Sequence, residues 1–158
     1  MPYLSGERTP HNDPTAQGVF FGMTHDTTSA SLAQAVLEGV GFAFADGLDA
    51  LADTGAEIGT ITMIGGGARS EYWGTILSAI LDRSLVYRDG GTFGPSYGAA
   101  RLAHLALTEE ATDVVCAPPQ ITNVIEPDDR QVDHYAGRRR LFRALYPQLK
   151  DLFWENRA

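Results

Sequence analysis

Three consecutive glycines, Gly65, Gly66 and Gly67, constrain the fold of this chain more than any other feature. They follow the β-branched run at residues 58–64, which predicts a strand, and Ser70 can cap a helix predicted over residues 71–81. A strand that leads into glycines and a helix N-terminus offers bare backbone N–H groups and partial positive charge, which suits a nucleotide. Because the run matches neither the Walker pattern nor the Rossmann fingerprint, a tight turn without a ligand stays an open alternative.

The segment before the glycines is predicted to form a loop, a short strand and a long helix. Three prolines and one glycine in residues 1–17 favour irregular structure, and the apolar run at residues 19–23 predicts a short buried strand. Apolar residues recur at spacings of three and four between residues 32 and 51, which predicts a helix of about 20 residues. Side chains at residues 24–28 can cap that helix, and Gly55 can end it.

The segment after the glycines continues the alternation of strands and helices. Residues 85–87 are predicted to form a second strand. A glycine-rich loop at residues 90–95 then precedes a helix of small residues at 97–103. Strands that alternate with helices in this way predict an α/β fold with parallel strand pairing.

The last 45 residues are predicted to form a loop, an extended stretch and a long helix. The loop covers residues 114–119 and the extended stretch covers residues 121–125. The helix is predicted to begin near Asp129 and to be bent or interrupted near Pro147. Three arginines at residues 138–140 lie within it, and we interpret them as a solvated helix face, with an anion site as the alternative.

Composition limits the class of protein. With 158 residues, 44% of them hydrophobic, the chain can form one domain with a substantial core. Its formal net charge of −8 argues against binding to nucleic acid or to an anionic membrane surface. No secretory signal and no apolar run long enough for a membrane span are visible, and the single cysteine allows no intrachain disulfide. We therefore expect a cytoplasmic protein in a reducing compartment.

Several chemically notable residues are predicted to be structural. Cys116 has no nearby base in sequence and is predicted to be a small buried residue. The four histidines lack the spacing that would place two imidazoles on one helix face, so we predict no histidine metal site. Six aromatic residues on helical stripes are predicted to pack in the core. They are Trp73, Trp154, Phe42, Phe44, Phe142 and Phe153.

Five motifs, read together, change the interpretation of the glycine run. They are Ser-Gly-Glu-Arg-Thr-Pro-His at residues 5–11, Gly-Val-Phe-Phe-Gly-Met-Thr-His at 18–25, Leu-Ala-Gln-Ala-Val-Leu-Glu-Gly-Val at 32–40, Ile-Gly-Gly-Gly-Ala-Arg-Ser at 64–70 and Tyr-Gly-Ala-Ala-Arg at 97–101. In this order they closely resemble the C-terminal region of the FGGY family of carbohydrate kinases. The first motif resembles the xylulokinase branch more than the glycerol or gluconate branches. The resemblance spans essentially residues 1–158 and implies a single nucleotide-binding domain of the actin-like, ribonuclease H-like ATPase fold.

The resemblance also implies an activity, its cofactors and a site. The activity is transfer of the γ-phosphoryl group of ATP, with Mg²⁺, to the 5-hydroxyl of D-xylulose. The residues matched to the family's adenosine motif are Gly65, Gly66, Gly67, Ala68, Arg69, Ser70 and Glu71. Arg69 is expected to flank the base. The loop at residues 24–28, which contains Asp26, is expected to reach the phosphates from the other side, and residues 7–11 are expected near the cleft. Ser31 departs from the family pattern, which usually has a larger polar or charged residue there.

Two parts of the family's catalytic machinery precede the matched region. These are the catalytic aspartate and a phosphate-binding Asp-Gly-Thr turn, and neither occurs in these 158 residues. Asp13 and Asp26 are the nearest candidates for the base, but we assign no catalytic residue and no metal ligand within the chain. We expect a fragment that is inactive alone because the N-terminal sugar-binding lobe is missing. An exposed edge of the sheet near residues 61–64 is expected to recruit that lobe or a second copy.

Two other functions stay open from the sequence. The chain could belong to another FGGY sugar kinase, because sugar choice depends mainly on the missing lobe. It could also be a non-catalytic binding or assembly module. A coding segment upstream that contains the two aspartate motifs would distinguish these possibilities.

Overall fold

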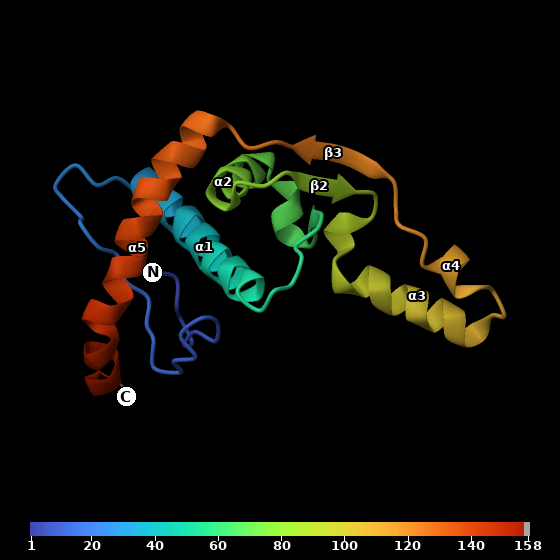
Figure 1. Cartoon of the computed structure of the whole chain (residues 1–158), viewed down its shortest axis with the longest axis horizontal. Helices are drawn as coiled ribbons and strands as arrows, with labels where there is room; N and C mark the ends of the chain where they lie inside the picture. The colour runs from blue at the N-terminus through green and yellow to red at the C-terminus, as the bar shows by residue number, and fades with distance from the viewer. Residues whose placement is uncertain (157–158) are drawn as a thin grey trace.

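The protein is a mixed α/β domain in which a small sheet lies beside a group of packed helices (Figure 1). The computed structural model describes residues 1–156. In chain order the elements are α1 (Ser29–Ala52), β1 (Ile61–Met63), the 3₁₀ turn η1 (Gly66–Arg69), α2 (Glu71–Leu81), β2 (Leu85–Arg88), the 3₁₀ turn η2 (Gly91–Phe93), α3 (Pro95–Leu107), α4 (Thr112–Val115), β3 (Ile121–Ile125) and α5 (Asp129–Glu155). None of the described helices combines the length and the apolar character needed to cross a bilayer.

The sheet has three strands in the order β1-β2-β3. β1 and β2 are parallel, with Ile61 opposite Leu85 and Met63 opposite Tyr87, and α2 connects them. This confirms the predicted parallel pairing. β3 is antiparallel to β2, so the predicted extended stretch at residues 121–125 forms a third strand. β1 pairs with β2 alone within this sheet and is therefore an edge strand.

Local sequence signals explain where the helices begin. The hydroxyl of Thr28 accepts a hydrogen bond of 3.1 Å from the backbone N–H of Ser31 and caps α1. Ser70 caps α2 in the same way through the N–H of Trp73, at 3.2 Å. Both caps satisfy N–H groups that a helix leaves unpaired at its first turn. The predicted capping segment and the predicted cap at Ser70 are confirmed.

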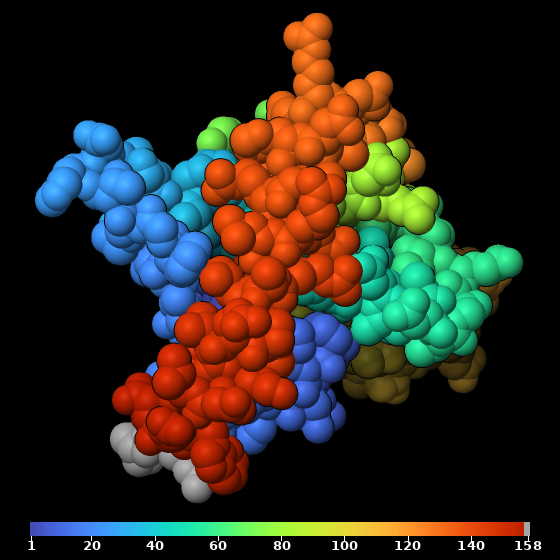
Figure 2. Space-filling view, turned by 60° about the vertical axis from the view of Figure 1, so that its left-hand side comes forward, coloured from blue at the N-terminus to red at the C-terminus, as the bar shows by residue number. Residues whose placement is uncertain are grey.

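Helices α1, α2 and α5 enclose the main apolar core. Its buried members are Tyr3, Ala16, Phe42, Ala45, Ile76, Ala79, Ile80, Tyr135, Phe142 and Phe153. Figure 2 shows α5 running down one face of the molecule, with the blue N-terminal segment against its C-terminal half. There the Tyr146 hydroxyl donates a 2.9 Å hydrogen bond to Asp13, and the rings of Tyr146 and His11 stack at 3.6 Å. α5 therefore holds the irregular N-terminal segment against the core.

Ion pairs between α1 and α5 correct the interpretation of the arginine triplet. Glu38 and Asp46 are buried on α1, with exposed fractions of 5% and 2%. Arg138 Nε donates to Glu38 at 2.9 Å, and Arg139 Nη2 donates to Asp46 at 2.6 Å. Arg143 also contacts Asp46, at 3.2 Å. A solvated helix face was thus the wrong prediction for Arg139, whose side chain is 20% exposed and neutralises a carboxylate 93 positions earlier in the chain. Arg138 is half exposed, as predicted, but it pairs with Glu38, 100 positions earlier.

The predicted strand at residues 19–23 does not form. Phe20, Phe21 and Met23 are exposed, and this segment leads as an irregular loop into α1. The strand predicted at residues 58–64 is also shorter than expected, because pairing with β2 begins at Ile61. A strand requires a hydrogen-bonded partner, which apolar composition alone does not supply.

Four further predictions need correction. The predicted loop at residues 114–119 begins inside α4, and Cys116 is exposed rather than buried. Phe44 and Trp154 are more than half exposed, whereas the other four aromatic residues predicted for the core are buried or half-buried. α5 runs through Pro147 as one continuous helix, so no interruption occurs there. Exposure of these side chains depends on which neighbouring elements cover them, and the local sequence pattern does not determine that.

Candidate functional site

The glycine run forms a turn between β1 and α2, as predicted. Gly65 has a φ of +79°, a conformation that L side chains rarely adopt, and it turns the chain away from the strand. η1 follows, and Ser70 then begins α2. The turn is closed by hydrogen bonds from the N–H of Ala68 to the carbonyl of Gly65 and from the N–H of Ser70 to the carbonyl of Gly67, both 3.1 Å. All seven residues predicted for the adenosine motif therefore lie in one compact turn.

A second glycine turn packs against the first. After β2 the chain passes through Gly90, Gly91 and Gly94, and the N–H of Gly65 donates a 2.8 Å hydrogen bond to the carbonyl of Gly91. A Cβ placed on Gly94 would lie 3.3 Å from the Gly65 Cα, so the two backbones approach closely. Both turns follow the carboxyl ends of parallel strands, which is where open α/β sheets bind ligands.

Sequence reasoning missed this second turn as part of the site. It identified residues 90–95 only as a loop, although the signal was present, because a glycine-rich run directly followed the second strand of a predicted parallel pair. Parallel strands bring their carboxyl ends to the same edge of a sheet, so both runs had to meet there. The ring of Tyr97, at the start of α3, lies against this second turn and would be 3.7 Å from a Cβ on Gly90.

The first turn has an open face and a packed face. A Cβ on Gly65 or Gly66 would meet nothing within 4 Å, so the backbone there is open to an approaching molecule. A Cβ on Gly67 would instead overlap Cζ3 of the Trp73 ring and lie 2.9 Å from its Cε3. Gly67 is thus required by packing within the chain, whereas Gly65 and Gly66 expose backbone.

The charges around the turn favour the uncharged part of a nucleotide. Glu71 lies in the first turn of α2, where its carboxylate opposes the binding of a phosphate at that helix end. Its Oε1 accepts a 3.5 Å hydrogen bond from the side chain of Asn123 on β3. Arg69, the one basic residue of η1, is exposed and available to stack on a planar ring. The arrangement is suited to a nucleoside held by backbone contact and a guanidinium plane.

Asp26 lies apart from the glycine turns. It is exposed in the loop before α1, where its N–H donates a 3.3 Å hydrogen bond to the hydroxyl of Thr24. Figure 1 shows this loop at the left-hand edge of the view, on the opposite side of α1 and α2 from the sheet. The structure does not bring Asp26 together with Gly65 to Glu71, so its contact with nucleotide phosphates stays a prediction.

Asp13, the other carboxylate near the predicted cleft residues, is poorly suited to act as a base. The hydroxyl and the backbone N–H of Thr15 both donate to its Oδ1 at 2.7 Å, and Tyr146 donates to its Oδ2. These hydrogen bonds, with that of the Thr15 hydroxyl foremost, lower the pKa of Asp13 below its usual value. A carboxylate stabilised in its charged form accepts a proton less readily.

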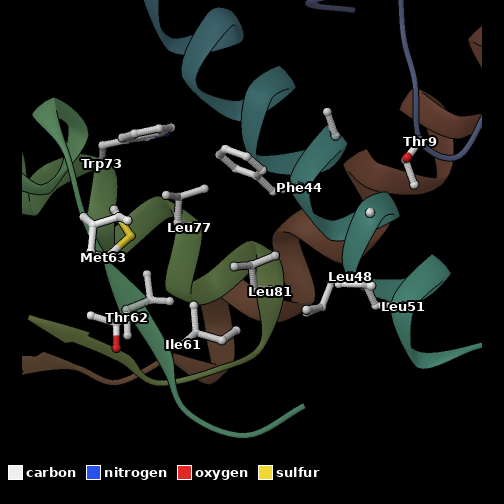
Figure 3. Close-up of a pocket in the computed structure, with 14 residues that line it drawn as sticks. Thr9, Phe44, Leu48, Leu51, Ile61, Thr62, Met63, Trp73, Leu77 and Leu81 are labelled. Carbon is white, nitrogen blue, oxygen red and sulfur yellow. The ribbon is translucent and has the colours of Figure 1, made fainter. Parts of the chain in front are cut away.

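An apolar groove of about 670 Å³ lies between α1, β1 and α2 (Figure 3). Figure 3 shows Phe44, Leu48 and Leu51 of α1 on one side and Ile61 and Met63 of β1 on the other. No charged side chain lines this groove in the described part of the chain. It therefore offers nothing to hold a phosphate, and its lining is typical of a surface that packs against protein.

The model of the FGGY family of carbohydrate kinases, C-terminal domain, matches residues 1–107. The chain belongs to this family. It is 50% identical over 153 residues to the xylulose kinases of Klebsiella pneumoniae and of Escherichia coli K12, a match that covers 96% of this chain and 32% of each relative. The crystal structure of a xyloylose kinase from Brucella ovis superposes with a TM-score of 0.84 at 43% identity, over 96% of this chain and 31% of that chain.

These comparisons confirm the resemblance that the five motifs indicated, and with it the fold class. The α/β fold is that of the actin-like FGGY sugar kinases. The chain spans about one third of the length of the relatives that it matches. The family model ends at residue 107, so β3 and α5 lie outside it, although the match to the xylulose kinases covers 96% of this chain.

Proposed function

We propose that this chain is the nucleotide-binding C-terminal part of a xylulose kinase. The intact enzyme would transfer the γ-phosphoryl group of ATP to the 5-hydroxyl of D-xylulose. The observation that carries the proposal is the pair of glycine turns at the carboxyl ends of β1 and β2, in a chain 50% identical to named xylulose kinases. The proposed reaction takes place in the cytoplasm, and the free thiol of Cys116 suits its reducing conditions.

The residues proposed to hold ATP are those of the first turn. They are Gly65, Gly66, Gly67, Ala68, Arg69, Ser70 and Glu71, with Asp26 proposed near the phosphates. The open backbone at Gly65 and Gly66 fits the flat face of a nucleoside, because no atom of the described residues other than the chain neighbours lies within 4 Å of a Cβ built there. Gly67 leaves the space that the ring of Trp73 occupies when it packs against the turn. When bound, ATP supplies the phosphoryl group, and the role of this chain is to bind and orient the nucleoside.

Mg²⁺ is proposed to accompany ATP, but this chain contributes no site that we can assign to it. Among the described residues, no group of three or more His, Cys, Asp or Glu side chains gathers closely enough to hold a metal ion. Since Mg²⁺ is commonly bound by one or two carboxylates together with substrate phosphates, we propose that its ligands come from the other part of the intact enzyme. The same part is proposed to supply the catalytic base and the sugar site.

Two features support an N-terminal lobe as the partner of this chain. The first is the groove between α1, β1 and α2, which is apolar and uncovered. The second is the free edge of β1, which leaves one side of a parallel strand unpaired within the sheet. Both lie on the same strand, so one packed lobe could cover them together.

Coupled kinase assays on the intact enzyme and on this chain alone test the proposed function. We expect the intact enzyme to phosphorylate D-xylulose with ATP and Mg²⁺, and the 158 residues to show no turnover. An intact enzyme that accepts only gluconate or glycerol would contradict the sugar assignment while leaving the kinase assignment in place. This alternative is worth measuring because the gluconate kinase of Lactobacillus acidophilus superposes with a TM-score of 0.73 at 26% identity. Turnover by the chain alone would contradict the placement of the base outside it.

A further inference from the structure

The segment at residues 19–21 has the composition of a strand, but most of it is not paired with another strand. Phe20 and Phe21 are 52% and 66% exposed, although aromatic residues favour a paired, half-buried strand. Among the described residues, the backbone N–H groups of Phe20 and Phe21 donate to no backbone carbonyl. Figure 2 shows the loop that follows this segment projecting from the body of the molecule. An apolar segment with unpaired backbone groups is a site where another strand can add to the structure by hydrogen bonding.

The first residues of the chain already begin a ladder with this segment. Pro2 forms an antiparallel bridge with Gly18. Met1 and Val19 exchange two hydrogen bonds, of 2.6 Å from the Met1 amino group to the carbonyl of Val19 and of 3.0 Å in the opposite direction. Two residues that exchange both bonds form the hydrogen-bonded pair of an antiparallel ladder, and such pairs alternate with non-hydrogen-bonded pairs.

This pattern fixes the register of any residues that precede Met1. The residue directly before Met1 would lie opposite Phe20 as a non-hydrogen-bonded pair. The residue before that would lie opposite Phe21 and exchange both hydrogen bonds with it. Gly22, with a φ of +79°, turns the chain after Phe21, so the ladder would end there.

We propose that the residues immediately before Met1 in the intact kinase form an antiparallel strand with residues 19–21, in this register. The proposal rests on the proposed function, in which this chain is part of a longer kinase. The matching family model describes a C-terminal domain, and two thirds of each relative lie outside the match, so a large segment precedes the matched region in those relatives. A preceding segment is tethered at Met1 and needs no second molecule to reach the edge.

The state of the Met1 amino group is consistent with this strand. Burial of the amino group lowers its pKa, because the charged form loses hydration at this position. A peptide N–H in the same place would donate the same hydrogen bond to Val19 without a charge to desolvate. A second copy of this chain is a weaker candidate, because each copy carries a formal net charge of −8 and a partner strand would have to reach the edge past Met1.

Amide hydrogen exchange on three versions of the chain tests the proposal. The first is the 158 residues as they stand, the second is preceded by Thr-Val-Thr-Val, and the third by Thr-Val-Pro-Val. We expect exchange at the Phe21 amide to slow at least about tenfold in the second version, since its N–H gains an acceptor. The Phe20 amide, in a non-hydrogen-bonded pair, should keep its rate. Proline at the second position before Met1 lacks the N–H that would donate to the Phe21 carbonyl, and its ring crowds the paired strand. The ladder should therefore not extend to Phe21, although the proline carbonyl remains, and the third version should match the first.

Equal exchange at Phe21 in all three versions would overturn the proposal, and protection at Phe20 instead would overturn the register. Protection at Phe21 in the first version that grows with protein concentration would identify a second copy as the occupant. In the intact kinase, the Phe21 amide should exchange as slowly as that of Val86 on β2, and fast exchange there would overturn the pairing without reference to the shorter chain. None of these measurements uses phosphoryl transfer, so a wrong sugar assignment would leave their outcome unchanged.

Discussion

Gly66→Val and Gly67→Val should affect different properties of the intact kinase, nucleotide binding in the first case and stability in the second. A side chain on Gly66 would point into open space, because a Cβ there meets nothing within 4 Å. A side chain on Gly67 would overlap the ring of Trp73, which is itself half-buried between α1 and α2. Gly66→Val should therefore obstruct the ligand and spare the fold, whereas Gly67→Val should strain the fold directly.

The structure sets the size of each effect. Forcing a side chain into packed surroundings costs about 1–3 kcal/mol, and for Gly67→Val the obstacle is the large, half-buried ring of Trp73 rather than a flexible chain end. The upper part of that range corresponds to a fall in Tm of roughly 4–9 °C in a domain of this size. Gly66→Val should change the free energy of unfolding by less than about 1 kcal/mol. A valine on the open face should weaken ADP binding at least about tenfold, or about 1.4 kcal/mol.

Titration calorimetry with ADP and thermal unfolding, both on the intact kinase, separate the two effects. Gly59→Val is the matched control, because a Cβ on Gly59 also meets nothing within 4 Å but lies before β1 rather than after it. We expect the control to leave both affinity and Tm nearly unchanged. Unchanged ADP affinity in Gly66→Val would refute the proposed nucleotide site and reduce the glycine run to a tight turn. A Tm in Gly67→Val equal to that of the control would refute the packing argument.

Three further outcomes follow from contacts elsewhere in the fold. In this chain, Gly74→Ala should lower the free energy of unfolding in urea by about 2 kcal/mol, because its Cβ would overlap Tyr87 Oη and approach Ile125. Gly98→Ala on exposed α3 should instead raise that free energy by up to about 1 kcal/mol. Equal effects of the two variants would contradict the close packing of α2 on the sheet. Arg139→Ala should lower the free energy of unfolding by about 3 kcal/mol in the same assay, because it leaves Asp46 buried with Arg143 as its remaining partner. Arg140→Ala, on the exposed side of α5, should lower it by less than about 0.5 kcal/mol. Similar losses in the two variants would show that the ion pairs are not coupled to folding. Burial foremost, and then the hydrogen bond to Asp13, raise the pKa of Tyr146 to about 12. The neutral Tyr146 hydroxyl therefore contributes fully to stability below pH 10, and this contribution is lost as the pH rises towards 12. Tyr146→Phe should make the decline of the unfolding free energy over this pH range less steep, and an unchanged slope would contradict this role of Tyr146.

The parts of the fold that the sequence predicted are those whose causes lie within a few residues. α1 and α2 each combine an apolar periodicity with a side chain that caps the first turn, and these signals act within one or two helical turns. β2 was predicted because its β-branched and aromatic residues are bounded by turns. Parallel pairing of β1 with β2 followed from the helix between them, since a tight turn cannot connect parallel strands.

The parts that the sequence failed to predict depend on partners far away in the chain. Arg138 and Arg139 were assigned to solvent because nothing near them in sequence identifies Glu38 and Asp46 as their partners. Residues 19–23 have strand-forming composition, yet the ladder available to them ends at Met1. In both cases the local pattern predicted the chemical character of the segment correctly, but it did not identify the residues that the segment contacts.

The glycine run itself shows how far a motif can be interpreted without a structure. In sequence Gly65, Gly66 and Gly67 are equivalent, and a single explanation, close approach of backbone to a nucleotide, covered all three. In the structure they differ: Gly65 is required by its positive φ, Gly67 is required by the ring of Trp73, and a Cβ on Gly66 would meet no described residue within 4 Å. A glycine that the fold itself does not require can be replaced to test a ligand site without straining the fold. Gly66 is the one residue of the three that meets this condition, and for that reason its substitution is the sharpest test of the nucleotide site.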